Sequence, residues 1–254
     1  MGKVLIEEMS WTEFREAMKE TDLVIIPVGV IEEHGCHNPL GTDTFIAEEC
    51  ARLVGEAVNA PVAAVMPFGY SPNVASFPGT ISLDPMLYRK VLVSYAESYI
   101  KHGAKRFLFI NGHGGNTNIL AMAAADLFDK YGAICTYNQW WEVLPKLNSE
   151  WNCSDHGGYF ETSMMMAVNE SIIDLDKAKA APVNNLTEGI EYNHGWHYKG
   201  ATIPIPIDLY KVHKYGNVGN EPFKANKELG QQMIDTYVEF NISLAKELKK
   251  VEIM

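Results

Sequence analysis

The fold is decided by the stretch Leu23-Val-Ile-Ile-Pro-Val-Gly-Val-Ile-Glu-Glu-His-Gly-Cys-His-Asn-Pro-Leu-Gly-Thr-Asp43. Its apolar first part, residues 23–28, predicts a buried β-strand, and the alanine-rich segment 45–58 that follows predicts a helix. The loop between them concentrates carboxylates and imidazoles beyond the carboxyl end of a strand, where open α/β sheets place their ligand sites. We therefore interpret this loop as one half of a metal site.

The same order of strand, loop and helix recurs along the chain. Apolar segments predict buried strands at 62–67, 106–110 and 133–137, and helices at 11–19, 85–102, 117–131, 163–168 and 221–250. Parallel strands need crossover connections, so we expect one α/β domain over 1–254, with a mainly parallel sheet of about four strands and helices on both faces. The proline-bearing region 180–215 predicts loops and edge pieces, and Gly230 could interrupt the last helix.

Composition limits the classes of partner and compartment. The chain has 254 residues and a formal net charge of −11, and its 21 Lys and Arg are scattered. Phosphate binding needs clustered cations, so we expect a small-molecule substrate, and neither nucleic acid nor a membrane surface as a partner. No run of about 18 apolar residues could span a bilayer, no signal peptide is recognisable, and the cysteines lack Cys-x-x-Cys spacing. These features predict a cytoplasmic protein.

Three loops carry side chains that bind metals. They supply Glu32, His34 and Asp43, then His113, then His156 and Glu161. In a parallel sheet these loops meet at one edge. Oxygen and imidazole donors without thiolate suit Zn²⁺, Mn²⁺ or Fe²⁺, and a shared aspartate would hold two ions about 3.5–4 Å apart. We therefore predict two divalent metal ions, a metal-bound hydroxide that attacks a carbonyl carbon, and His156 as the carrier of a proton to the leaving nitrogen.

Structural alternatives exist for these residues. Alone, Glu32 and Asp43 would more often be a surface acid and a helix cap. The segment Asn111-Gly-His-Gly-Gly-Asn116 could be a phosphate-cradling loop, but it lacks both the Gly-x-Gly-x-x-Gly spacing and a Walker lysine. The long loop 68–80, which contains Ser71, predicts a pocket wall.

Six motifs follow one another in a recognisable order. They are Pro27-Val-Gly-x-x-Glu-x-His-Gly35, Pro39-Leu-Gly-Thr-Asp43, Phe77-Pro-Gly-Thr80, Asn111-Gly-His-Gly-Gly-Asn116, His156-Gly-Gly-x-x-Glu-Thr-Ser163 and Gly216-x-Val-Gly219. This order resembles the creatininase (creatinine amidohydrolase) family over nearly the whole chain. The resemblance implies a compact α/β fold, a binuclear metal amidohydrolase, and a homo-oligomer that is usually a hexamer.

The resemblance also implies roles for single residues. The implied metal ligands are Glu32, His34, Asp43 and His113, with Asp43 bridging the two ions. His156 matches the catalytic or substrate-binding histidine. Trp141 and Trp151 lie near positions where creatininase uses tryptophans to enclose a flat cyclic substrate, so we place them with Ser71 in the substrate pocket.

Two departures from creatininase bear on the site. Creatininase has a glutamate ligand where this chain has Gly115, and we infer that Glu161, or a water, takes that coordination place, which gives Glu161 both a ligand and a catalytic role. Many relatives read Ser-Pro-Glu-His where this chain has Ser71-Pro-Asn-Val74, so a polar contact is lost. The family also includes a formamidopyrimidine deformylase and a peptidase-like member, so the resemblance does not single out creatinine.

The resulting prediction is a metal-dependent amidohydrolase that cleaves a C–N bond other than a peptide bond. We expect a small cyclic or heteroaromatic substrate, such as a creatinine-like lactam or a formamide. Two alternatives stay open: a non-catalytic metal- or small-molecule-binding protein that keeps the fold, and a deformylase acting on a formamidopyrimidine nucleotide. Residues His194, Trp196 and His197 are candidates for a role between subunits.

Overall fold

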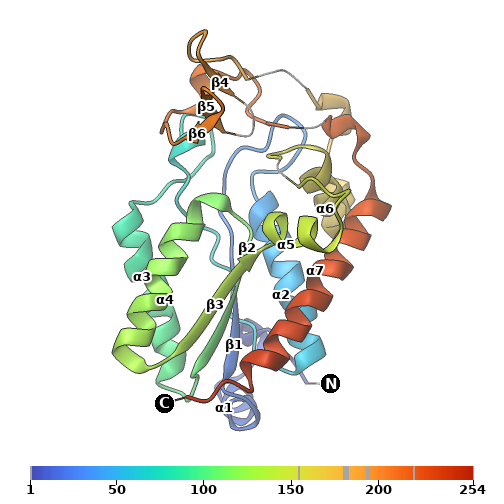
Figure 1. The fold of residues 1–254 in the computed structure, drawn as a ribbon. Helices are drawn as coiled ribbons and strands as arrows, with labels where there is room; N and C mark the ends of the chain where they lie inside the picture. The colour runs from blue at the N-terminus through green and yellow to red at the C-terminus, as the bar shows by residue number, and fades with distance from the viewer. Residues whose placement is uncertain (1, 154, 180–182, 193–194, 220, 254) are drawn as a thin grey trace.

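A three-stranded parallel sheet forms the centre of the computed structural model, which describes residues 2–153, 155–179, 183–192, 195–219 and 221–253 (Figure 1). Its strands are β1 (Leu23–Val28), β2 (Arg106–Asn111) and β3 (Ile134–Gln139), in the order β1-β2-β3. Val28 pairs with Asn111, and Asn111 with Gln139, so all three strands end at one edge. Every residue of β1 and β2 is buried, as expected of strands covered on both faces.

The predicted strand at 62–67 is wrong as a continuous strand, because this segment makes only isolated bridges to β1. Ile25 N donates to Pro61 O at 3.0 Å, as in a regular parallel ladder. The next donor on β1 would be Pro27, which has no N–H, and beyond it the pairing resumes one residue late, with Met66 N on Pro27 O at 3.0 Å. The sheet therefore has three strands rather than about four.

Helices cover both faces of the sheet (Figure 1). One apolar cluster joins alternate residues of β1 and β2, such as Ile25 and Leu108, to α2 (Thr42–Val58), α5 (Trp140–Leu147), α6 (Tyr159–Asn169) and α7 (Lys227–Leu248). The other cluster joins the remaining residues, such as Ile26 and Phe107, to α3 (Pro85–Ile100) and α4 (Thr117–Tyr131). The alternation follows from the two-residue period of a strand.

Two helices differ from their predicted extents. α7 begins at Lys227 rather than at residue 221, and it continues through Gly230 without a break. A Cβ atom at Gly230 would lie 1.8 Å from the carbonyl oxygen of Ser163, so glycine allows α7 to approach α6 closely. α6 begins four residues earlier than predicted, which places Glu161 in its first turn.

Shorter elements complete the fold. β4 (Ile190–Tyr192), β5 (Trp196–Tyr198) and β6 (Ala201–Ile203) form a small antiparallel sheet above the carboxyl edge of the main sheet, where only loops and edge pieces were predicted (Figure 1). His194 lies outside the described residues, and the roles of Trp196 and His197 between subunits stay a prediction. The remaining helices are α1 (Trp11–Glu20) and the 3₁₀ turns Ile6–Glu8, Pro72–Val74, Gly114–Asn116, Glu170–Ile172, Leu175–Lys177, Leu209–Lys211 and Pro222–Lys224. None of the described helices combines the length and apolar composition that a bilayer crossing requires.

Candidate metal centre

The ends of β1 and β2 and the start of α6 bring the predicted ligands together. Two sets of donor atoms each lie within 4.8 Å of one another, and they share Asp43. The first triad is Glu32, Asp43 and His113, and the second triad is His34, Asp43 and Glu161. A further set combines Glu32, His34 and His156.

Asp43 lies between two imidazoles. Its Oδ1 is 2.9 Å from Nε2 of His34, and its Oδ2 is 3.0 Å from Nδ1 of His113. Only 2% of Asp43 is exposed, so both oxygens are shielded from bulk water. The helix cap is Gly41, so the carboxylate does not cap α2. A buried carboxylate whose two oxygens face different imidazoles has the arrangement that a ligand bridging two cations requires.

Backbone carbonyls decide which nitrogen of each histidine is a donor. Nδ1 of His34 is 3.1 Å from the carbonyl oxygen of Glu32, and Nε2 of His113 is 3.0 Å from that of Tyr70. A carbonyl only accepts, so these nitrogens carry the protons. The opposite nitrogens face Asp43 with a lone pair available for a metal once the rings are neutral, as in other metal-ligating histidines.

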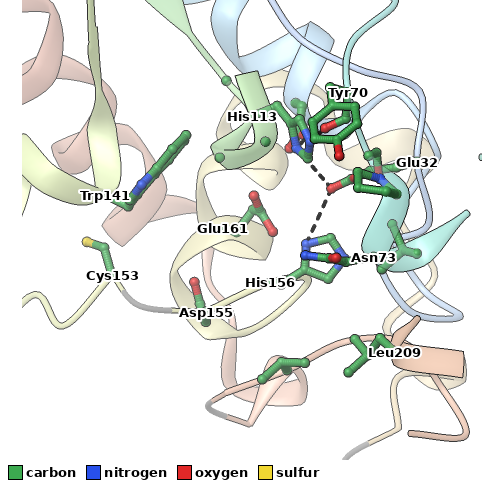
Figure 2. A pocket seen from close by; sticks show the side chains of 18 of the residues that line it. Glu32, Tyr70, Asn73, His113, Trp141, Cys153, Asp155, His156, Glu161 and Leu209 are labelled. Carbon is green, nitrogen blue, oxygen red and sulfur yellow. Dashed lines mark hydrogen bonds and ion pairs between the residues drawn. The ribbon is translucent and has the colours of Figure 1, made fainter. Parts of the chain in front are cut away.

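Glu161 supplies the carboxylate of the second triad. Its Oε2 lies 3.5 Å from Nε2 of His34 and accepts a hydrogen bond from Gly157 N at 2.6 Å. Figure 2 shows the side chain pointing into the same cavity as His113. A Cβ atom at Gly115 would lie 2.0 Å from the carbonyl oxygen of Tyr70, so position 115 leaves no room for a ligand side chain.

His156 stands beside the triads. Its Nε2 is 3.0 Å from Oε1 of Glu33. Its Nδ1 is 3.6 Å from Oε1 of Glu32, an ion pair drawn as a dashed line in Figure 2. Its ring lies 4.4 Å from that of His34. Glu33, which was not among the predicted site residues, is 5% exposed and also accepts a hydrogen bond from Gly35 N at 2.9 Å. The sequence feature that could have identified Glu33 is its position directly after the predicted ligand Glu32.

The ionisable groups shift one another strongly. Burial opposes protonation of His113, but the charge of Glu32 and the hydrogen bond to Asp43 raise its pKa to about 10. Burial likewise opposes protonation of His34, whose pKa is nevertheless well above the usual value because of Asp43 and Glu161. Burial would raise the pKa of Asp43, but the two imidazoles lower it below the usual range. The residues alone therefore form imidazolium–carboxylate pairs, and divalent cations would take the place of those protons.

A cavity of about 340 Å³ opens beside the triads (Figure 2). Its lining includes Glu32, Tyr70, Ser71, Asn73, Trp140, Trp141, Cys153, Asp155, Tyr192 and Leu209, and none of the described lining residues is a Lys or Arg. Ser71 does line it, and its hydroxyl donates to Oε2 of Glu32. Trp151 does not: Trp151 N bonds to Asn148 O at 3.1 Å, and the side chain packs against the apolar core instead. The second lining tryptophan is Trp140.

Asp155 is a lining residue that sequence reasoning missed. Its Oδ2 accepts a hydrogen bond from Phe160 N at 2.8 Å and so binds a free N–H at the start of α6. Burial, followed by the charge of Glu161, raises its pKa to about 7. A Cβ atom at Gly158 would lie 2.4 Å from Asp155, so glycine at position 158 leaves room for this carboxylate. The order Asp155-His-Gly-Gly158 is the sequence feature that could have identified Asp155.

Comparisons with known proteins identify the family that the chain resembles. The family model "Creatininase: Creatinine amidohydrolase" matches residues 7–244. Creatinine amidohydrolase of Pseudomonas putida is 29% identical over 203 residues, which are 70% of this chain and 77% of that protein. The mycofactocin precursor peptide peptidase of Mycolicibacterium smegmatis is 40% identical over 117 residues, 44% of this chain, so the chain matches about half (47%) of that relative.

A solved structure supports the fold. A mutant creatininase of the "Zn-Zn type" has a TM-score of 0.81 at 22% identity, over 98% of this chain and 99% of that chain. At this identity the match shows the fold alone. The predicted creatininase-like α/β fold is thereby confirmed.

Proposed function

The chain belongs to the creatininase family, and from this premise we propose that it is an amidohydrolase that uses two divalent metal ions. We propose that it cleaves a C–N amide bond in a small cyclic or heteroaromatic substrate. The observation that carries this proposal is that Asp43 is common to both triads, with one oxygen toward His34 and the other toward His113. Carboxylate and imidazole donors suit Zn²⁺, Mn²⁺ or Fe²⁺.

The two triads would hold divalent ions, which would supply Lewis-acid chemistry that acidifies a water molecule and polarises a carbonyl group. The protein's own part is to move the proton. Glu33 holds Nε2 of His156, so that Nδ1 faces Glu32 and the cavity. Nδ1 can therefore donate a proton to the leaving nitrogen, while Glu33 stabilises the imidazolium.

The cavity supports a small substrate without a phosphate. Its volume of about 340 Å³ lies at the lower end of the range for small-molecule sites. Tyr70, Trp141 and Tyr192 provide apolar ring surfaces, and the lining residues within the described ranges include no Lys or Arg to bind a phosphate. Lactams and formamides fit this lining better than a formamidopyrimidine nucleotide.

A second candidate activity is the cleavage of a peptide bond. The 40% identity to a mycofactocin precursor peptide peptidase favours it, and a cavity of this size would admit the end of a peptide.

The non-catalytic alternative rested on the missing ligand at Gly115, and the approach of Glu161 to His34 at 3.5 Å argues against it.

The decisive experiment counts metal ions. We expect two divalent ions per purified chain, none in Asp43→Ala because a bridging ligand serves both ions, and two in Asp84→Ala. Asp84 is a matched control, because it also lies at a helix start but caps α3 by accepting from Leu87 N. Folded wild-type protein without stoichiometric divalent ions would refute the proposal.

Substrate and assembly need separate measurements. Lactams, formamides, cyclic ureas and short peptides should be screened with Zn²⁺, Mn²⁺ and Fe²⁺, and turnover of peptides alone would favour the second candidate.

We further propose a homo-oligomer, with the hexamer as the expected form, which light scattering after size-exclusion chromatography can test.

A further inference from the structure

The second triad is assembled from two separate segments. His34 and Asp43 belong to the loop after β1 and the first turn of α2, whereas Glu161 belongs to the first turn of α6. The donor oxygens of Asp43 and Glu161 lie within 4.8 Å of each other, and Nε2 of His34 lies 2.9 Å from the first and 3.5 Å from the second. The geometry of this triad therefore depends on the contacts that hold α6 against the loop.

Thr162, the residue after Glu161, makes such a contact. Asn38 Nδ2 donates to its hydroxyl oxygen at 2.9 Å, and Nε2 of His37 lies 3.1 Å from the same oxygen. Thr162 is fully buried and His37 is 2% exposed. The hydroxyl thus joins α6 to the ligand loop at a position adjacent to a predicted metal ligand.

The loop is shaped to make this contact. Gly35 has a φ of +74°, which side-chain-bearing residues rarely adopt, and a Cβ atom there would lie 2.9 Å from the His37 ring. The chain therefore turns back at Gly35 and brings His37 under α6. Burial lowers the pKa of His37 to about 4, so its ring is neutral and forms an uncharged hydrogen bond with Thr162.

The next residue of α6 faces away from the loop. Ser163 accepts a hydrogen bond from Asn226 N at 3.1 Å, and its carbonyl lies against Gly230 of α7. Thr162 and Ser163 are thus two neighbouring buried hydroxyls, one directed to the ligand loop and the other to the segment that begins α7. Their comparison separates an effect on the metal site from a general effect on the packing of α6.

We propose that the Thr162 hydroxyl is a positioning group that, through His37 and Asn38, sets the affinity of the second triad for its ion. This inference rests on the proposed function, because it presupposes that the triads bind metal. The first triad has no ligand on α6, so its affinity should not depend on Thr162.

The test compares four chains by calorimetric metal titration of the apo proteins and by metal content after dialysis. Thr162→Val removes the hydroxyl and keeps the volume, and it should leave one ion tightly bound and weaken the other about 10- to 100-fold. Thr162→Ser restores the hydroxyl and should bind both ions as the wild type does. Ser163→Ala, the matched control, should also keep both. Thermal unfolding of each apo protein reports separately on folding.

A further variant covers the case in which Thr162→Val does not fold. Asn38→Ala removes one of the two partners at a partly exposed position and should weaken the same ion by a smaller factor. The inference is overturned if Thr162→Val or Asn38→Ala binds both ions with wild-type affinity, or if Ser163→Ala weakens the second ion as much as Thr162→Val does. If wild-type protein itself fails to bind two ions, the proposed function falls and this inference falls with it.

Discussion

Gly115 lies so close to Tyr70 that a Cβ atom at position 115 would be 2.0 Å from the Tyr70 carbonyl oxygen. The same carbonyl accepts the hydrogen bond from Nε2 of His113 at 3.0 Å and so orients that ring. Backbone packing therefore leaves no room for a side chain at position 115, and the carboxylate that lies near His34 and Asp43 is that of Glu161 on α6.

The first prediction concerns Gly115→Ala. Its Cβ would meet Tyr70 O at 2.0 Å and Nε2 of His113 at 2.6 Å, so we expect a loss of about 1–3 kcal/mol in unfolding free energy and weaker binding at the first triad. Gly114→Ala is the control, because its Cβ would meet only Trp141, at an ordinary 3.9 Å. Denaturant unfolding and metal content measure both effects, and equal behaviour of the two variants would contradict the packing argument.

The second prediction separates proton transfer from metal binding. His156→Gln should lower kcat by about 10²- to 10⁴-fold while both ions stay bound, because His156 belongs to neither triad. His102→Gln, on the α3 side of the sheet near Phe14, should leave both quantities unchanged. Loss of one ion in His156→Gln would instead identify His156 as a ligand with Glu32 and His34.

The third prediction concerns the pH dependence of turnover. Burial and the charge of His34 lower the pKa of His156, but Glu33 raises it, and the net result is a pKa of about 9. Glu33→Gln keeps the shape and removes the charge, so the pKa of His156 should fall. The limb of the kcat/KM profile that reports His156 should then move to lower pH, and an unmoved limb would show that Glu33 does not tune this group.

The fourth prediction concerns protons released by metal binding. His34 and His113 have raised pKa values and are protonated at neutral pH without metal, whereas metal ligands must be neutral imidazoles. Loading both triads at pH 7 should therefore release about two protons, and metal affinity should rise with pH until the pKa of His113, about 10, is passed. Calorimetry in buffers of different ionisation enthalpy counts these protons, and a count near zero would contradict the prediction.

Most of the main sheet and its helices could be predicted because their apolar periodicity is local. The strands expected at 23–28, 106–110 and 133–137 match β1, β2 and β3 to within two residues at each end. The strand expected at 62–67 was wrong because its continuity depends on Pro27, which belongs to another segment and lacks the N–H that the pairing needs.

Side-chain direction was harder to predict than backbone class. Trp141 lines the cavity as expected, but Trp151 packs on the core because the chain turns between Asn148 and Trp151. Similarly, α6 begins four residues earlier than predicted, so Glu161 lies in a helical turn and not in a loop. In both cases a local turn or helix start, which periodicity does not locate, decides where the side chain points.

By itself, the sequence determined the inventory of the centre, because carboxylates and imidazoles placed after parallel strands must gather at one edge of the sheet. It named Glu32, His34, Asp43, His113 and Glu161. Only the tertiary structure decided how their atoms are allocated between two triads, and which neutral groups hold them. That allocation depends on contacts such as Glu33 with His156 and His37 with Thr162, which join segments more than 100 residues apart, and no local pattern encodes such distances.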